Sequence, residues 1–120
     1  MENLSPLLIE YQGLLKLIRN IKSMALNGLW DDVVEQEIVY IQSIERISQI
    51  TVPANIPSTV QLQFRQLLQD ILDTESQVKE LLQNRMQELA VLIQQSQNQK
   101  SINSTYAEFS NDILPGKPQP

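Results

Sequence analysis

The fold depends on one uninterrupted stretch, residues 59–97, which reads TVQLQFRQLLQDILDTESQVKELLQNRMQELAVLIQQSQ. It contains neither Gly nor Pro, and its apolar residues recur at steps of three and four. That spacing places the apolar side chains on one face of an α-helix. The predicted face comprises Val60, Phe64, Leu67, Leu68, Ile71, Leu72, Val78, Leu81, Leu82, Met86, Leu89, Leu92 and Ile93. At 1.5 Å per residue, such a helix is about 58 Å long.

Two shorter helices are predicted before this stretch. Ser5-Pro6 is typical of a helix start and Asn27-Gly28 of a helix end. The apolar stripe between them comprises Leu7, Leu8, Tyr11, Leu14, Leu15, Ile18, Ile21, Ala25 and Leu26. After a turn of a few residues the chain must return antiparallel. The predicted face of the second helix comprises Val33, Val34, Ile38, Ile41, Ile44 and Ile47.

Trp30 stands at the corner between these two helices and has two interpretations. It could be a structural plug buried against Leu26 and Val33 or Val34, or an exposed anchor for a partner. The first is favoured. After the second helix, Pro53 and Pro57 indicate a connector, because proline lacks a backbone donor and restricts the residue before it.

The first helix is only about 30 Å long, so the two short helices cannot cover the whole long one. A candidate cover follows in the same chain. Residues 94–100 are almost wholly polar and could end the long helix or serve as a hinge. The apolar residues after them, at steps of four, three and four, predict a short amphipathic helix. These residues are Ile102, Tyr106, Phe109 and Ile113. A helix of this length is marginal alone in water and must dock on something.

The predicted fold is therefore all-α: an antiparallel bundle of three main helices, the third very long, plus a short C-terminal fourth helix. The predicted organisation is a three-helix body at 1–98, a short regulatory helix at 99–114 and a disordered tail at 115–120. The surface left for the fourth helix is a groove on the long helix formed by Val78, Leu81, Leu82, Met86 and Leu89.

Composition excludes most catalytic chemistry. The chain has no Cys and no His, which removes the usual thiolate and imidazole ligands, nucleophiles and bases. Its three Gly are isolated, so no phosphate-binding loop is present. Acidic residues on the helices favour a solvated face over a metal or acid–base site; they are Glu35, Glu37, Asp70, Asp73 and Glu80. We therefore expect no enzyme, no catalytic residues, no metal and no cofactor.

Charge and localisation signals point the same way. The net charge of −5 argues against direct nucleic-acid binding, which needs a basic patch. The one basic stripe, Lys16, Arg19 and Lys22, is better explained as a solubilising outer face. The N-terminus lacks the pattern of a signal peptide, and no apolar run approaches the roughly 20 residues that span a bilayer. A cytoplasmic protein is expected.

Four segments, in this order and spacing, resemble the FliT-type flagellar export chaperones of enteric bacteria. They are Gly28-Leu29-Trp30-Asp31, the stretch from Glu35 to Glu45, the stretch from Leu81 to Leu89, and the stretch from Gln99 to Tyr106. Each is a helix fragment that is not diagnostic alone, but the arrangement covers about residues 7–114.

The resemblance implies a cytoplasmic chaperone that binds the C-terminal segment of the filament-cap protein and delivers it to the export ATPase complex and the export gate. It also implies that the cargo-free chaperone binds the flagellar master transcriptional activator complex and keeps it from DNA. The last helix of such chaperones folds back over a cleft used by partners, which corresponds here to residues 102–113.

Two alternatives stay open from the residues alone. Ile102, Tyr106 and Phe109 either complete a permanent four-helix core or form a displaceable, autoinhibitory helix, and the resemblance favours the second. The other class of function is a non-enzymatic adaptor whose long helix mainly mediates homodimerisation. A dimer that persists on dilution without bound cargo would favour the adaptor.

Overall fold

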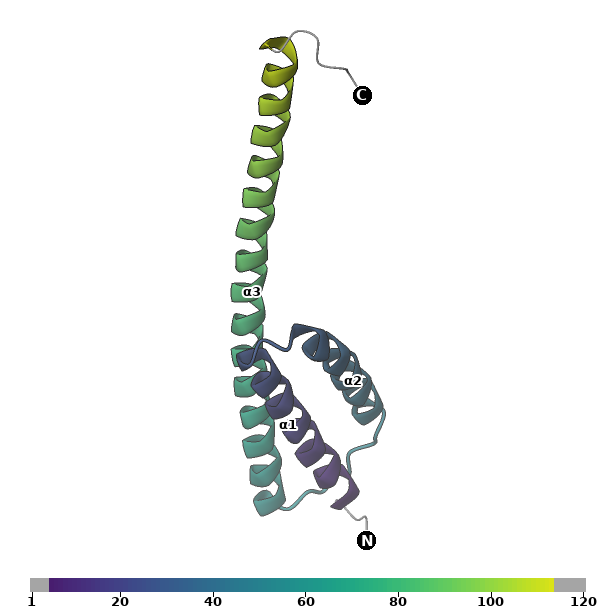
Figure 1. Ribbon diagram of the computed structural model, residues 1–120. Helices are drawn as coiled ribbons and strands as arrows, with labels where there is room; N and C mark the ends of the chain where they lie inside the picture. Colours follow the sequence, from purple (N-terminus) through teal and green to yellow (C-terminus); the bar gives the residue numbers. More distant parts are fainter. Residues whose placement is uncertain (1–4, 114–120) are drawn as a thin grey trace. The chain divides into compact units, whose positions relative to one another are not determined.

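The computed structural model describes the backbone of residues 5–113 and the side chains of residues 6–109. It contains three helices, α1 (Ser5–Leu26), α2 (Trp30–Ser48) and α3 (Ser58–Ile113), and these residues form no strand (Figure 1). The all-α class and the very long third helix are thus confirmed. The side chain of Ser5, predicted to cap α1, and the predicted tail at 115–120 lie outside the described residues.

The chain divides into two compact units, residues 1–82 and residues 83–120. Unit 1 contains α1, α2 and the first part of α3, and unit 2 contains the rest of α3. Within unit 1 the chain runs along α1, back along α2 and forward again along α3, so that α2 is antiparallel to both neighbours (Figure 1). This is the up-and-down order that the short first turn predicts.

The corner between α1 and α2 is a Schellman motif. Gly28 has a φ of 73°, in the left-handed region, and its N–H donates to the Ala25 carbonyl at 3.1 Å. The N–H of Leu29 donates to the Met24 carbonyl at 2.9 Å. These two bonds satisfy carbonyls that the end of a helix leaves unpaired, and glycine adopts the required φ without a Cβ clash. Trp30, the first residue of α2, is half-buried and packs against the core.

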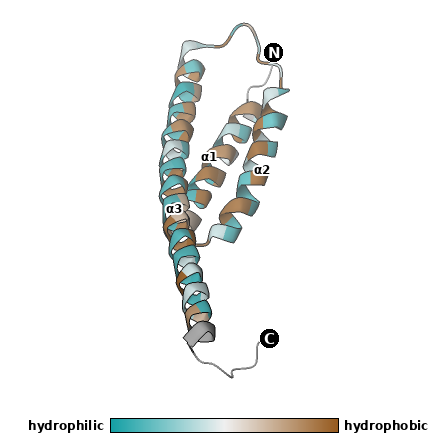
Figure 2. Cartoon of the chain, turned by 90° about the horizontal axis from the view of Figure 1, so that it is seen from above, coloured by the Kyte–Doolittle hydropathy of each residue, from teal (hydrophilic) through white to brown (hydrophobic). Residues whose placement is uncertain are grey.

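The core of unit 1 is built around α1. The buried apolar side chains of the described chain are Leu7, Leu14, Leu15, Ile18, Ile21, Ala25, Val33, Tyr40, Ile47, Ile71 and Val78. The predicted stripe of α1 has nine residues, and six of them are among these buried side chains. The interpretation of α1 therefore holds except at its last residue, Leu26, which is 63 % exposed. Hydrophobic residues recur along all three helices of unit 1 (Figure 2).

The predicted face of α2 is wrong in part. Val34, Ile38, Ile41 and Ile44 are exposed, and Tyr40, which the predicted face did not include, is 3 % exposed. The buried stripe of α2 runs through Val33, Tyr40 and Ile47 at steps of seven residues. Two apolar stripes lie on this helix, and the tyrosine can be buried because its hydroxyl has a hydrogen-bond partner on α3, described below.

The predicted fourth helix is not a separate element. Residues 102–113 continue α3 without a break, and residues 94–100, the predicted hinge, are helical. Two side-chain hydrogen bonds at i, i+4 spacing extend through this segment, from Gln94 Nε2 to Asn98 Oδ1 at 3.3 Å and from Gln99 Nε2 to Asn103 Oδ1 at 3.2 Å. A polar composition does not end a helix when it lacks Gly and Pro and its residues pair along the surface.

The docking expected of residues 102–113 stays a prediction. The side chains of Ile102, Tyr106 and Phe109 are 60 %, 72 % and 61 % exposed, and that of Ile113 lies outside the described residues. In the described part of the chain, no helix is long and apolar enough to span a membrane.

The corrected face of α2 yields a paired test of the core. Replacing Ile47, which is 7 % exposed, with Ala should lower the free energy of unfolding by about 2–4 kcal/mol, because it removes buried methylenes and leaves a cavity. The same change at Ile38, which is 55 % exposed, should cost less than about 1 kcal/mol. Urea unfolding followed by circular dichroism measures both. Equal losses would restore the face that the sequence pattern predicted.

Candidate functional site

Unit 1 carries a long apolar groove made of two adjoining cavities. The first, of about 340 Å³, lies among α1, the α2–α3 connector and α3. The second, of about 210 Å³, is lined by residues of all three helices. Tyr11 and Leu68 line both cavities, so the two join into one surface, called the groove below.

The floor and rim of the groove are apolar. Tyr11 on the floor packs against Phe64 of α3 in an edge-to-face pair, with ring centroids 5.4 Å apart. The rim side chains Ile44, Leu68 and Leu72 are 39 %, 45 % and 50 % exposed. When a partner covers large aliphatic side chains that line a concavity and contact water, their burial stabilises the complex. The arrangement suits an amphipathic helix laid in a groove.

One end of the groove holds a polar contact between α2 and α3. The hydroxyl of Tyr40 donates to Glu75 Oε2 at 2.8 Å, and both residues line the second cavity. Burial, the hydrogen bond to Glu75 and the charges of Glu75 and Glu37 raise the pKa of Tyr40, so the hydroxyl stays a donor. Burial and then the charge of Glu75 also raise the pKa of Glu37. Two carboxylates therefore concentrate negative charge here.

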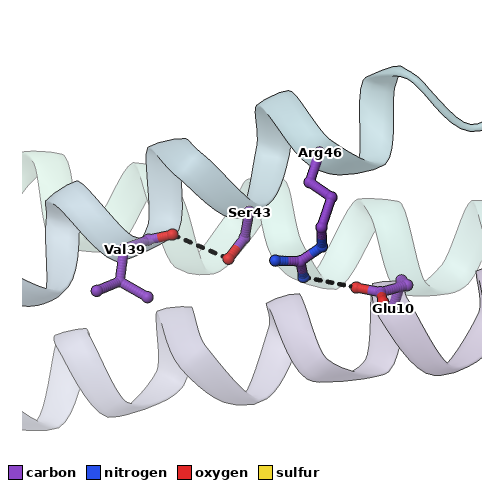
Figure 3. A network of polar contacts seen from close by, with 4 residues as sticks. All are labelled: Glu10, Val39, Ser43 and Arg46. Atoms are coloured by element: carbon purple, nitrogen blue, oxygen red, sulfur yellow. Dashed lines mark hydrogen bonds and ion pairs between the residues drawn. The ribbon is translucent and has the colours of Figure 1, made fainter.

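An ion pair joins α1 and α2 across the surface of unit 1. Arg46 Nη2 lies 2.8 Å from Glu10 Oε2, and the Ser43 hydroxyl beside it donates to the Val39 carbonyl at 2.9 Å (Figure 3). The Arg46 side chain is 62 % exposed, and a pair this exposed contributes only about 0.2–1 kcal/mol. Its main effect is to neutralise both charges near the groove.

The residues predicted to form a groove on the long helix are divided between the two units. Val78 is buried in the core of unit 1, and Leu81 and Leu82 are partly buried against that core. Met86 and Leu89 belong to unit 2 and are 67 % and 40 % exposed. Unit 2 adds further exposed apolar side chains, at Val91, Leu92, Ile93, Ile102, Tyr106 and Phe109.

Sequence reasoning missed most of the observed groove. It placed Leu68 and Leu72 on the long apolar face but did not separate them from the buried Ile71. One signal was available in the sequence. Leu68 and Leu72 each follow an apolar residue directly, so the apolar face at the start of α3 is wider than one that packs against a single neighbour. Tyr40 and Glu75 carried no signal, because their pairing joins residues 35 positions apart.

Comparison with known proteins shows the class to which this helical scaffold belongs. A family model described as "Flagellar protein FliT" matches residues 8–108. The flagellar protein FliT of Dickeya chrysanthemi is 97 % identical over 120 residues, covering all of both chains. That of Pectobacterium carotovorum subsp. carotovorum is 50 % identical over 115 residues, covering 95 % of this chain and 91 % of its own. That of Serratia proteamaculans is 38 % identical over 120 residues, covering 99 % and 98 %.

These matches define a flagellar protein. The chain belongs to the FliT family, as the resemblance of its four segments predicted.

The carboxylates at the end of the groove generate a test of stability against pH. A raised pKa means that folded Glu37 binds its proton more tightly than the unfolded chain does, so its contribution to stability falls as pH rises from the ordinary value of 4.5 through the folded pKa. Glu37→Gln should therefore stabilise the protein at pH 7, by less than about 1 kcal/mol at this exposure, and the gain should vanish well below pH 4. Urea unfolding at pH 3.5 and 7 measures the difference.

The matched control is Glu35→Gln, which removes a carboxylate from an exposed position on the same helix. It should change stability by less than about 0.5 kcal/mol at pH 7. A loss of stability in Glu37→Gln at pH 7 would contradict a Glu37 pKa that burial and the charge of Glu75 raise.

Proposed function

We propose that this protein is a cytoplasmic, non-enzymatic flagellar type III export chaperone. Its cargo is the C-terminal segment of the filament-cap protein, which it delivers to the export ATPase complex and the export gate. The observation that carries the proposal is the groove of unit 1, an apolar concavity with an exposed rim in a member of a flagellar family. An export cargo segment held before assembly has apolar surface that needs cover, and a groove of this kind provides it.

The cargo site can be tested with one charge placed on the rim. Leu72→Glu, at a side chain that is 50 % exposed, should leave the fold intact and weaken binding of the filament-cap segment at least tenfold, because docking would bury an unpaired carboxylate. Titration calorimetry with the purified segment measures the affinity. Thermal melting of the variant verifies that unit 1 is folded.

Leu62→Glu is the matched control. Leu62 lies on the same part of α3 and is 56 % exposed, but it is not among the residues that line the groove. Its affinity for the segment should stay within about twofold of the original protein. If both variants bind the segment like the original protein, the groove is not the cargo site.

A second activity is proposed for the cargo-free protein: binding of the flagellar master transcriptional activator, which keeps that complex from DNA. The support is the net charge of −5, which disfavours a direct contact with DNA, together with exposed apolar side chains in unit 2. We propose that residues 99–113 compete with partners for the groove, since Ile102, Tyr106 and Phe109 form an apolar stripe of the kind that an apolar groove accepts. Occupation requires α3 to open within residues 94–100.

Removal of residues 99–120 tests this competition. The shortened protein should keep its thermal midpoint within a few degrees, because no buried core residue among the described side chains lies beyond Val78. It should block the activator's retardation of promoter DNA at a severalfold lower concentration than the full chain, and it should bind the export ATPase more tightly. Neither form should retard DNA alone. Unchanged potency in both assays would show that the C-terminal segment does not compete.

The exposed stripe of α2, formed by Val34, Ile38 and Ile41, favours a second candidate function, that of an adaptor that forms homodimers. Light scattering across a dilution series separates the two. A mass that stays at two chains at every concentration, in a protein that binds no filament-cap segment, would favour the adaptor.

A further inference from the structure

The two ends of the groove carry opposite charges. Arg65 lines the first cavity, at the end formed by the α2–α3 connector, and Glu75 lines the second. Both belong to the part of α3 in unit 1, ten residues apart, which corresponds to about 15 Å along the helix. The groove between them is apolar.

Neither charge is neutralised within the described part of the chain. Arg65 and Glu75 take part in no ion pair there, and the one polar partner of Glu75 is the neutral hydroxyl of Tyr40. The nearby Arg46 and Glu10 neutralise one another. Glu37, whose pKa responds to the charge of Glu75, adds a second carboxylate at the same end. A docked partner therefore meets a positive end and a negative end.

We infer that the groove is charge-polarised, and that it selects a partner helix with an acidic residue facing Arg65 and a basic residue facing Glu75, separated by eleven positions and joined by an apolar face. Eleven residues of an α-helix span about 16.5 Å and make just over three full turns, so both charges stay on the face that enters the groove. The inference rests on the proposed function, because it specifies the partner chemistry of the same groove.

The chemical consequence is selection of register and direction rather than high affinity. Apolar side chains alone would let a helix slide by one turn or enter in either direction. Two charged ends penalise both errors, because a wrong placement brings like charges together or leaves a charge uncovered. Each pair remains partly exposed, so its expected effect on the dissociation constant is about twofold to fivefold.

Four synthetic helical peptides of equal length test the inference. They share one apolar face and differ only at two positions eleven residues apart, which carry Glu and Lys, Glu and Glu, Lys and Lys, or Gln and Gln. Fluorescence anisotropy with the full chain at about 0.15 M salt measures their affinities. The acid–base peptide should bind the protein twofold to fivefold more tightly than each of the other three.

Charge reversal on the protein should then change the preferred peptide. Glu75→Lys creates a groove with two cations and should favour the Glu and Glu peptide, whereas Arg65→Glu should favour the Lys and Lys peptide. Glu75→Gln, whose amide oxygen can still accept from Tyr40, should abolish the preference for a basic residue without removing that hydrogen bond. This variant keeps the test decisive if Glu75→Lys does not fold.

Matched controls separate a local effect from a change in net charge. Glu80→Lys on α3 and Arg19→Glu on α1 alter exposed charges that line neither cavity, and both should preserve the ranking of the original protein. The same ranking in Glu75→Lys as in Glu80→Lys would overturn the inference.

Three further outcomes are distinguishable. If the filament-cap segment binds but the four peptides bind equally, the inference fails and the proposed function stands. If neither the segment nor any peptide binds, both fail. If the protein is a dimer that Glu75→Lys dissociates, the groove is filled by a second copy of the chain, and the inference is likewise overturned.

Discussion

Burial of α1 is the constraint on which the rest of unit 1 depends. Its side chains at Ile18 and Ile21 have no exposed surface, and they reach that state only when α2 and α3 both pack on the same helix. Val33 of α2 and Val78 of α3 are equally buried and belong to the same core. Because one helix serves two partners, α2 and α3 need not cover each other completely.

The groove forms because α2 and α3 both pack on α1 and do not cover each other completely. Beyond the core, α2 and α3 meet through a hydrogen bond from Tyr40 to Glu75, and the space beside it is lined by aliphatic side chains that no other described element covers. The three helices of unit 1 carry more apolar side chains than their mutual contacts bury. The apolar side chains that stay exposed line the groove. The chain belongs to a flagellar family, and under the function proposed above this surface would hold an apolar cargo segment. Under the charge-polarised groove inferred above, the charges at its ends would act on specificity, because exposed ion pairs add little to affinity.

Unit 2 differs in physical character from unit 1. Its helix keeps large apolar side chains exposed, among them Met86 and Tyr106, and its described side chains, up to residue 109, form no buried core. Such a helix is stabilised by local propensity and by pairs such as Gln94–Asn98, each of which contributes only a few tenths of a kcal/mol. A segment held by local terms alone can change its conformation at small cost when a partner binds. This is the physical basis for proposing that residues 99–113 regulate access to the groove.

The sequence by itself determined the helical class, the positions of the first two turns and the buried stripe of α1. These depend on local rules: Gly28 supplies a left-handed φ, Pro53 and Pro57 exclude helix, and a three-and-four spacing defines a face. The same rules placed Leu68 and Leu72 on an apolar face of α3 without revealing that they line a groove.

Only the tertiary structure decided which stripe of α2 is buried. Val34 and Ile38 are as apolar as Val33 and Ile47, and the buried stripe is the one whose Tyr40 bonds to Glu75, a residue far away in the sequence. The tertiary structure also decided that residues 94–100 continue α3. A polar segment leaves the helical conformation only where packing against another element stabilises the bend. The sequence pattern of one helix identifies its apolar residues. The neighbouring helices determine which of these residues are buried.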